Sequence, residues 1–372
     1  MYNVLTLNKI AKCGTDRLGE NYAVSDECAN PDAVLVRSAS MHDTAMPESL
    51  LAIARAGAGV NNIPISDCAE KGIAVFNTPG ANANAVKELV VAGLLMSSRK
   101  INQGIAWANS LKGNGDQVGK MVEKGKSNFA GPEIMGKTLG VVGLGAIGIK
   151  VANVATALGM KVVGCDPFLS EENKAKLVDC KVVDTNDEVY AEADYITVHV
   201  PLNDGTRGMI NSETIAKMKD GVRVLNYSRD GLVVSADILS ALKSGKMSAY
   251  VTDFATDDIL GEEGVIAMPH LGASTPESED NCAMMAADEI KDYLENGNIV
   301  NSVNLPCLTK ERTGGTRVCV IAKGCADTEK LKEMCGSDDA VTAVRGDYSY
   351  TIIDNAKSSD VQCDCVVKVR TL

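Results

Sequence analysis

Only three of the 372 residues are histidines, so acid–base chemistry near neutral pH has few candidates in this chain. His42 stands in the polar segment SASMHDT, which favours an exposed loop, and His199 alternates with Thr197 in the apolar run ITVHVPL, which favours a hydrogen-bonded core position. His270 ends the apolar run VIAMPH. Because strand ends face the ligand crevice of an open α/β sheet, His270 is the candidate for accepting a hydroxyl proton during hydride transfer.

Charged side chains follow two other apolar runs. Arg229 follows RVLNYS, and its guanidinium suits a substrate carboxylate held through two parallel hydrogen bonds. Asp257 and Asp258 follow AYVTDF, and one of them is expected to pair with the imidazole, fix its tautomer and raise its pKa. Taken singly, each charge would suit a solvated surface, but together they supply the functions that the reaction needs.

The glycine-rich turn GLGAIG lies between a strand pattern and a helical pattern, with Gly143, Gly145 and Gly148 at its motif positions. The first glycine permits a tight turn, the second lets the backbone approach a pyrophosphate, and the third allows close helix packing. Asp166 ends the next apolar run, where a carboxylate accepts the hydroxyls of an adenosine ribose and repels a 2′-phosphate. The pattern predicts a site for NAD rather than NADP.

The elements around these residues follow the rhythm of an α/β protein with a doubly wound parallel sheet. A long helix is predicted over Asn82–Ile101, and residues 111–132, rich in glycine and lysine, are predicted to form a loose surface connection. A second long helical pattern ends at Gly297, and strand patterns after Pro306 predict a small further unit. Strands are expected in the runs 33–36, 51–54, 73–76, KTLGVVG, KVVGCD, YITVHV, RVLNYS, AYVTDF and VIAMPH.

Composition narrows the classes of partner. With 49 acidic and 37 basic side chains the net charge is −12, which argues against nucleic acid and membranes as partners. No signal peptide and no run of about 18 apolar residues is recognisable, so a cytoplasmic protein is expected. The twelve cysteines, Cys363 and Cys365 included, are expected to be reduced thiols, and no metal site is expected.

The segments GVVGLGAIG, CDPF, HVPL, NYSRDGLV and PHLGAST resemble the D-isomer-specific 2-hydroxyacid dehydrogenases, and VRSAS, ARAGAGVNNI and FNTPGANANAVKE resemble substrate-binding segments of that family. The resemblance covers residues 1 to about 305. It implies a Rossmann domain at 102–282 that binds NAD, inserted in a flavodoxin-like substrate-binding domain formed by 1–101 and 283–305. Residues 316–372 resemble an ACT domain through TRVCVIAKG, RGDYSYTIID and VVKVRTL.

The resemblance also implies roles for single residues. His270 resembles the family's acid/base, Arg229 its carboxylate-binding arginine, and Asp257 or Asp258 the carboxylate beside the histidine, where the family usually has glutamate. Further positions expected to line the cofactor are Thr78, Ala146, Ile147, Val200, Pro201, Tyr227, Asp253, Gly272 and Ala273. Positions expected to face the substrate are Arg37, Ser38, Arg55, Ala56, Gly57, Ala58 and Gly59.

The implied activity is NAD-dependent oxidation of a phosphorylated 2-hydroxy acid, D-3-phosphoglycerate, by a homodimer or homotetramer. The same chemistry on glycerate, hydroxypyruvate or lactate is an alternative, because Glu70 replaces a basic residue that some members carry before KGI. A scaffold that only senses NAD is a third alternative, but it would not need Arg229, an aspartate and His270 together. In the ACT-like stretch the family's Asn-x-Pro-Gly-like turn is replaced by GCADTEK, so an effector site for serine is not expected.

Overall fold

The computed structural model describes residues 1–324 and 327–372, and the chain divides into two compact units. The first unit joins Met1–Asn82 to Pro276–Leu372, and the second is the continuous segment Ala83–Thr275. Helix α3 (Ala83–Arg99), which the sequence assigns to the substrate-binding domain, packs within the second unit. The predicted domain boundaries at 101 and 283 stay predictions, whereas the α/β fold class with parallel sheets is confirmed.

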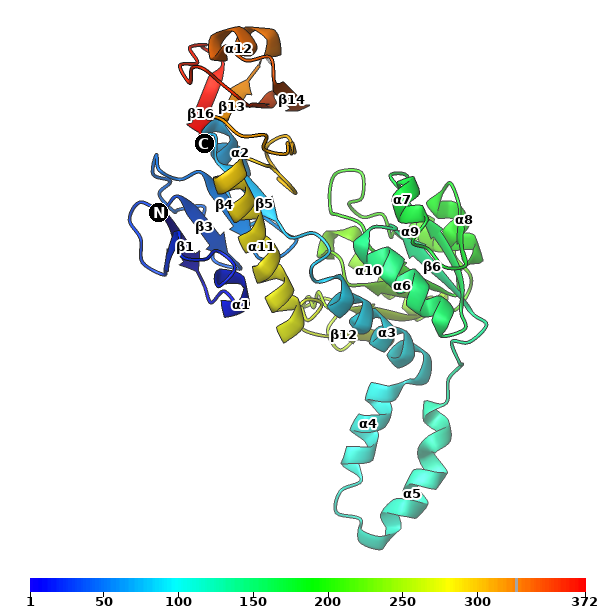
Figure 1. The fold of residues 1–372 in the computed structure, drawn as a ribbon. Coiled ribbons are helices and arrows are strands. Elements are labelled where there is room, and N and C mark those ends of the chain that lie inside the picture. Colours follow the sequence, from blue (N-terminus) through cyan, green and yellow to red (C-terminus); the bar gives the residue numbers. More distant parts are fainter. Residues whose placement is uncertain (325–326) are drawn as a thin grey trace. The chain divides into compact units, whose positions relative to one another are not determined.

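A five-stranded parallel sheet in the order β2-β1-β3-β4-β5 forms the base of the first unit (Figure 1). Strands β3, β4 and β5 are short and mostly apolar, and all four residues of β3 are buried, as expected where a parallel sheet is covered on both faces. The strands are β1 (Tyr2–Leu7), β2 (Tyr22–Ser25), β3 (Ala33–Val36), β4 (Ala52–Arg55) and β5 (Ala74–Asn77), and the short helices α1 (Lys12–Thr15) and α2 (Ile65–Glu70) lie between them.

The long helix α11 (Pro276–Asn296) covers one face of this sheet and packs against β3, β4 and β5. Its buried positions recur at helical spacing and include Cys282, Ala286, Ile290 and Tyr293. The helix ends as predicted at Gly297, whose φ of +71° is the left-handed conformation that favours glycine after a helix. This packing confirms the second long helix expected from the sequence.

The second unit contains a seven-stranded parallel sheet in the order β12-β11-β10-β9-β6-β7-β8. The chain runs outward from β6 through β7 to β8 and then returns to β9 on the other side of β6. Ligands of open α/β sheets bind at the carboxyl ends of the strands beside such a reversal of strand order. The strands are β6 (Thr138–Val142), β7 (Lys161–Cys165), β8 (Cys180–Val182), β9 (Tyr195–Val198), β10 (Val222–Asn226), β11 (Met247–Thr252) and β12 (Val265–Ala267). Besides α3, the helices around the sheet are α6 (Ala146–Ala157), α7 (Glu171–Lys174), α8 (Asn186–Glu192), α9 (Ser212–Ala216), η3 (Asp230–Leu232) and α10 (Ser235–Ser244).

A helical arm in the second unit replaces the loose connection expected at residues 111–132, so that expectation is wrong. The arm consists of α4 (Ile101–Ser110), η1 (Gly115–Gln117), α5 (Val118–Gly125) and η2 (Lys126–Phe129). The rings of Trp107 and Phe129 pack with centroids 5.2 Å apart, and a Cβ at Gly125 would lie 2.4 Å from the Trp107 ring. Contact around this tryptophan therefore stabilises helices in a segment whose glycines lower helix propensity.

The chain after α11 forms a four-stranded antiparallel sheet in the order β14-β15-β13-β16, compatible with the expected ACT-like domain. Arg317 is fully buried, with its Nε 2.6 Å from Asp354 Oδ1 and its Nη1 2.6 Å from the carbonyl oxygen of Asn296 at the end of α11. These bonds fix the sheet to the end of that helix. The elements are β13 (Val318–Lys323), α12 (Thr328–Cys335), β14 (Ala340–Arg345), β15 (Tyr348–Ile353) and β16 (Val366–Thr371).

Candidate functional site

The carboxyl edge of the seven-stranded sheet carries most of the chemically active residues predicted from the sequence. His270 follows β12, Asp253 follows β11, Arg229 follows β10, Gly143 follows β6 and Asp166 follows β7. These strands are parallel and lie side by side, so their ends meet at one edge. The sheet topology therefore brings His270, Arg229 and the glycine turn to one edge of the sheet, and the roles predicted for them stay predictions.

The glycine turn has the shape that its sequence predicts. Gly143 has a φ of +92°, and a Cβ there would lie 2.5 Å from the carbonyl oxygen of His199. A Cβ on Gly148 would lie 1.9 Å from the carbonyl oxygen of Gly143, so only glycine lets α6 pack this closely. A Cβ on Gly145, in contrast, would meet nothing within 4 Å. This open space above the N-terminus of α6 is where a pyrophosphate can approach the backbone.

Asp166 is fixed by two backbone bonds. Its Oδ2 accepts from the N–H of Leu144 at 2.9 Å, and its Oδ1 accepts from the N–H of Phe168 at 2.8 Å. Each carboxylate oxygen keeps a second lone pair for a ribose hydroxyl. Because the first bond joins Asp166 to the glycine turn, the carboxylate and the pyrophosphate position are held in fixed relation.

Two buried polar atoms beside β10 and β11 lack partners in the part of the chain that the structure describes. They are Asp253 Oδ1 and the Tyr227 hydroxyl oxygen, and both residues are almost fully buried. Burial raises the pKa of Asp253, while the N–H of Gly272 donates to its Oδ2 at 3.0 Å and lowers that pKa. A carboxamide carries both a donor and acceptors, so the nicotinamide of NAD fits these unsatisfied atoms.

His270 is exposed at the end of its strand, and its ring packs on Phe254 with centroids 4.8 Å apart. The charge of His270 opposes the burial effect on the Asp253 pKa, so these two groups interact. Asp258 is exposed and its Oδ1 accepts from Thr256 Oγ1, a bond that holds the Asp258 pKa below its usual value. Within residues 1–324 and 327–372 no hydrogen bond joins Asp257 or Asp258 to His270, and the pairing of one of them with the imidazole stays a prediction.

Two hydrogen bonds within the turn after β10 position Arg229. The amide Nδ2 of Asn226 donates to the carbonyl oxygen of Arg229 at 2.8 Å, and Asn226 is fully buried at the end of β10. The guanidinium Nη1 of Arg229 donates to the carbonyl oxygen of Ser228 at 2.6 Å. The turn after β10 thus holds the guanidinium at the same edge as His270.

The other two histidines lie in the settings that the sequence indicates. His42 is exposed, with Nε2 2.8 Å from the carbonyl oxygen of Asn61. His199 Nε2 lies 3.0 Å from Thr197 Oγ1, but its buried Nδ1 has no partner among the described residues. Burial lowers the pKa of His199 to about 3, so this imidazole stays neutral near pH 7 and is poorly suited to accept a proton.

Predicted substrate residues gather at the carboxyl edge of the five-stranded sheet in the first unit. Arg37 follows β3, Arg55 ends β4 and Thr78 follows β5, and these strands are neighbours. Arg55 Nε donates to the carbonyl oxygen of Arg37 at 3.1 Å. Gly57 has a φ of +148°, and a Cβ there would lie 1.7 Å from Arg55 Nη1. A side chain at position 57 would therefore clash with the Arg55 guanidinium.

Sequence reasoning missed two residues that shape this edge. Asn8, at a φ of +70°, accepts through Oδ1 from the N–H groups of Ser38 and Ala39 at 3.0 and 2.6 Å. Glu279 of α11 lies with Oε1 2.7 Å from Arg37 Nη2. An asparagine just after an apolar strand is a weak turn signal, but nothing in the sequence joins Glu279 to Arg37.

The remaining predicted site residues lie on or beside the elements described above, and their roles stay predictions. Ala146 and Ile147 begin α6, Val200 and Pro201 follow β9, and Ala273 follows Gly272 in the turn before α11. In the first unit Thr78 N–H donates to the carbonyl oxygen of Gly57 at 3.1 Å, and Asn77 Nδ2 donates to that of Ala58 at 2.6 Å. Ala56 and Gly59 belong to the same turn as Gly57 and Ala58.

The described residues contain no group of three or more His, Cys, Asp and Glu side chains that could hold a metal ion. No helix formed by those residues combines the length and the apolar character needed to cross a membrane. Glu70, the departure noted in the sequence, lies at the end of α2 with Oε1 3.6 Å from Lys323 Nζ of β13.

Comparison with known proteins links this geometry to one family. Residues 91–272 match the family model of the D-isomer specific 2-hydroxyacid dehydrogenase NAD binding domain. The chain is 35% identical over 331 residues to D-3-phosphoglycerate dehydrogenase of Bacillus subtilis, which covers 84% of this chain and 60% of that protein. It is 35% identical over 292 residues to D-3-phosphoglycerate dehydrogenase of Homo sapiens, covering 76% of this chain and 52% of that one. The chain therefore spans about half to three fifths of the length of these relatives.

Solved structures agree on the fold. The NAD⁺-bound 3-phosphoglycerate dehydrogenase of Entamoeba histolytica superposes with a TM-score of 0.61 and 26% identity over 82% of this chain and 98% of that one. A D-lactate dehydrogenase of Aquifex aeolicus, complexed with NAD and lactic acid, superposes with a TM-score of 0.62 and 24% identity over 82% and 99%. The segment 91–272 is thus an NAD-binding domain, in agreement with the glycine turn and Asp166.

Proposed function

The chain belongs to the D-isomer specific 2-hydroxyacid dehydrogenase family, and on that premise we propose that it oxidises D-3-phosphoglycerate to 3-phosphohydroxypyruvate with NAD. The observation that carries the proposal is the single sheet edge shared by the glycine turn at Gly143, Asp166, Arg229 and His270. Curated relatives named D-3-phosphoglycerate dehydrogenase support the choice of substrate.

NAD, when bound, accepts the hydride that leaves C2 of the substrate. The residues that would hold NAD are the Gly143–Gly148 turn, Asp166 at the adenosine ribose, and Tyr227 and Asp253 at the carboxamide. His270 accepts the C2 hydroxyl proton on a ring nitrogen as the C–H bond breaks. Arg229 binds the substrate carboxylate with its guanidinium and so orients C2.

The anionic C3 end of the substrate calls for further positive charge. Arg37 and Arg55 lie at the edge of the five-stranded sheet and are the candidates for the phosphate. Glu70 stands where some family members carry a basic residue, and its side chain pairs with Lys323, not with Arg37 or Arg55. Both arginines therefore keep their places at the edge of the sheet. This set supports a phosphorylated substrate over glycerate, hydroxypyruvate or lactate.

The decisive experiment measures NADH formation with a panel of D-2-hydroxy acids at equal concentration. D-3-phosphoglycerate should give the highest kcat/KM, and D-glycerate, which lacks only the phosphate, should be much poorer. A preference for D-glycerate or D-lactate would favour the alternative substrates. NAD binding without turnover of any acid in the panel would favour the NAD-sensing scaffold.

A homodimer or homotetramer is part of the proposal. No residue of α4 or α5 is buried, and Ile101 and Ile105 are 39% and 57% exposed on α4. An arm of this kind suits contact with a second copy, where its apolar side chains are covered. Light scattering on the purified chain should give twice or four times the monomer mass, and Ile105→Glu should lower the measured mass.

We also place the protein in the cytoplasm, where reduced thiols such as those of Cys68 and Cys335 persist.

A further inference from the structure

A groove with a volume of about 540 Å³ runs along one face of α11 in the first unit. Met284, Met285, Asp288 and Asp292 line it at helical spacing, and the loop after the helix closes one side. None of the residues assigned above to cofactor, substrate or proton transfer lines this groove. Its volume is in the range of sites for small molecules.

Glu289 also lines the groove and is its most unusual residue. The side chain is 7% exposed, and its Oε1 accepts from Asn301 Nδ2 at 2.7 Å. The other oxygen, Oε2, is buried and has no hydrogen-bond partner among the described residues. A buried carboxylate oxygen without a partner is costly, so a group that enters the groove and donates to it gains a strong bond.

Asn301 holds this carboxyl group in place from the loop after α11. Its φ of +57° is the left-handed conformation, which asparagine tolerates better than most residues. The N–H of Asn77 donates to the Asn301 carbonyl oxygen at 3.4 Å, which ties the loop to β5. Glu289 is thus held between its own helix and a fixed loop.

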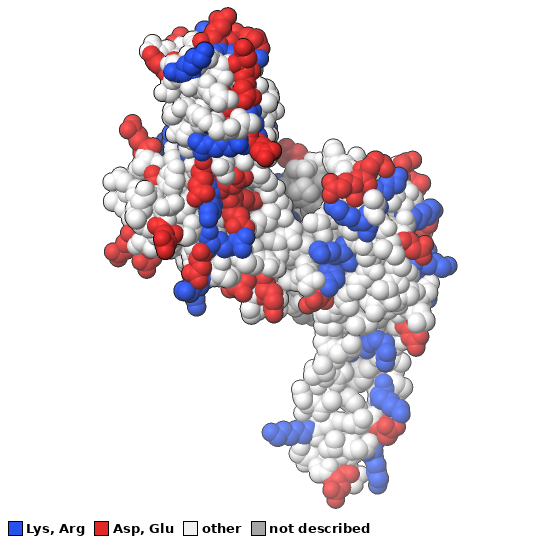
Figure 2. Space-filling view, in the orientation of Figure 1, with Lys and Arg blue, Asp and Glu red and all other residues white. Residues whose placement is uncertain are grey.

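The charges around the groove favour a cation. Arg17 Nε lies 2.6 Å from Asp288 Oδ1, so these two charges offset each other. Asp292 Oδ1 accepts from the side-chain amides of Asn296 and Asn298 at 2.8 and 3.0 Å, and no basic side chain among the described residues pairs with it. Acidic side chains lie beside basic ones over this part of the first unit in Figure 2. An ionised Glu289 adds to the uncompensated charge of Asp292.

Met284, Met285 and Val300 supply the apolar part of the lining. Met284 and Met285 are half-buried, and Val300, which follows α11 in the chain, is 40% exposed. Methionine side chains adapt readily to an alkyl group. The groove therefore offers a buried acceptor, negative charge and apolar surface together, which is the complement of an amine on an alkyl chain.

We propose that this groove binds a small organic cation, a protonated amine on a short alkyl chain, through an ion pair with Glu289. The ammonium group donates to Oε2, and the alkyl chain lies against Met284, Met285 and Val300. The site is independent of the proposed dehydrogenase activity, since no residue is shared with it.

Binding of the amine should release a proton from Glu289, and this release can be measured. Burial raises the pKa of Glu289 to about 8, with Asp288 adding to the rise and Asn301 opposing it. Near neutral pH the free carboxyl group is therefore largely protonated. When the ammonium ion binds, Glu289 releases this proton to the solvent and the charges pair. Affinity should rise with pH until Glu289 is ionised in the free protein.

Titration calorimetry with n-butylamine and 1,4-diaminobutane tests the proposal on the full chain. Both amines should bind, and n-butanol, which lacks the charge, should not. Between about pH 6.5 and 8 the affinity should rise roughly tenfold, which matches one proton released by a group with a pKa near 8. Parallel titrations in buffers of different ionisation enthalpy should show release of one proton per bound amine.

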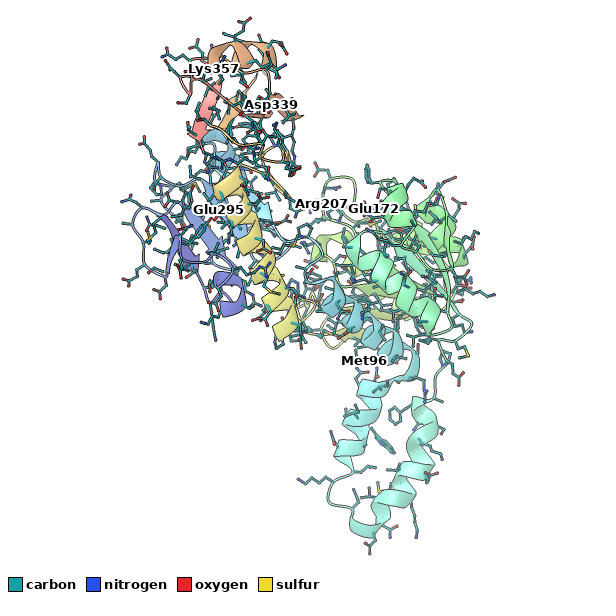
Figure 3. All side chains as sticks on the ribbon, in the orientation of Figure 1. Met96, Glu172, Arg207, Glu295, Asp339 and Lys357 are labelled. Carbon is teal, nitrogen blue, oxygen red and sulfur yellow. The ribbon has the colours of Figure 1, made fainter. Side chains whose placement is uncertain are left out.

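Glu289→Gln keeps the acceptor for Asn301 and removes the charge, so it should weaken amine binding at least tenfold and abolish proton release. Glu295→Gln is the matched control on the same helix; Glu295, labelled in Figure 3, accepts from the Tyr22 hydroxyl at 3.0 Å outside the groove. This control should bind amines like the wild type. The proposal is overturned if neither amine binds, if butanol binds equally well, or if no proton is released on binding to the wild type. Undiminished amine binding by a folded Glu289→Gln variant would also overturn it.

Discussion

Arg37 and Glu279 form an ion pair within the first unit, with Arg37 Nη2 2.7 Å from Glu279 Oε1. Arg37 is one of the two arginines proposed for the substrate phosphate, so a carboxylate already occupies the place that an anion would take. Both side chains are more than a third exposed, at 36% and 43%, and a pair of this kind contributes little to stability. On the role proposed for Arg37, a phosphate dianion would displace Glu279 at small cost, and the carboxylate would weaken the hold of Arg37 on the phosphate.

Replacing Glu279 by Gln should lower the KM for D-3-phosphoglycerate by about two- to fivefold at low salt, the range allowed by an exposed ion pair worth up to about 1 kcal/mol. The kcat should change little, because Glu279 does not take part in proton transfer. Initial-rate kinetics at two salt concentrations provide the measurement. Asp16→Asn, which removes a carboxylate from the exposed pair with Lys12, is the control. An unchanged or higher KM in Glu279→Gln would contradict the prediction.

His270→Ala should lower turnover by at least about 10², the usual size of lost general acid–base catalysis, while NAD binding persists. The reason is its place at the end of β12, beside Asp253 and Phe254. Stopped-flow turnover and NADH fluorescence titration separate the two effects. His42→Ala, at an exposed position, should behave like the wild type. Near-normal turnover in His270→Ala, with activity lost in a folded His199→Ala variant, would refute the assignment.

Asp166 should make the enzyme prefer NAD clearly over NADP, because its carboxylate would meet a 2′-phosphate at close range. Asp166→Ala should narrow the ratio of kcat/KM values for the two cofactors. Since Asp166 also accepts from Leu144 and Phe168, Asp166→Asn is the companion variant that removes the charge and keeps an acceptor. Equal kcat/KM values for NAD and NADP in the wild type would count against this role.

The pKa of His199, lowered to about 3 by burial, predicts how stability depends on pH. Below about pH 6.5 the unfolded chain binds a proton on this imidazole and the folded chain does not. The contribution of His199 to the free energy of unfolding is therefore complete above pH 6.5 and decreases as the pH falls toward 3. The loss amounts to at most about 5 kcal/mol across that window. Urea unfolding at several pH values should show a weaker pH dependence for His199→Gln than for the wild type. His42→Gln should leave it unchanged, and equal curves for His199→Gln and the wild type would contradict the prediction.

Local sequence patterns were sufficient to predict which residues lie at the carboxyl edge of the seven-stranded sheet. The glycine spacing and the apolar runs ending at Asp166, Arg229 and His270 each depend on residues close in sequence, and parallel topology brings the strand ends together. The Arg37–Glu279 pair joins distant parts of the chain through the packing of α11 on the first sheet, so no local pattern encodes it. The arm was missed for a related reason, because the contact between Trp107 and Phe129 joins the two ends of this segment and no local pattern shows it.

The C-terminal sheet should matter for stability more than for turnover. The guanidinium of Arg370 in β16 lies 4.4 Å from the Tyr293 ring centroid and donates to the carbonyl oxygens of Tyr293 and Leu294 at 3.1 and 3.0 Å. Residues of β13 and β15 share a core with α11, including Ile321 and Ile352. Deleting residues from Thr316 onward would expose this core, so it should lower the melting temperature or change the assembly while kcat falls less.

L-Serine at millimolar concentration should leave the activity of the full chain nearly unchanged. An effector amino acid needs free backbone N–H groups after β13, where the sequence has GCADTEK. Cys325 and Ala326 of this sequence segment lie outside the described residues. Beyond them, Asp327 Oδ1 already accepts from the N–H of Lys330 at 3.1 Å and caps α12 with its own carboxylate. A second carboxylate from serine would meet like charge at that helix end. Serine titrations of the full chain and of the variant truncated at Thr316 provide the measurement, and strong inhibition of the full chain that disappears on truncation would show that this unit carries a working regulatory site.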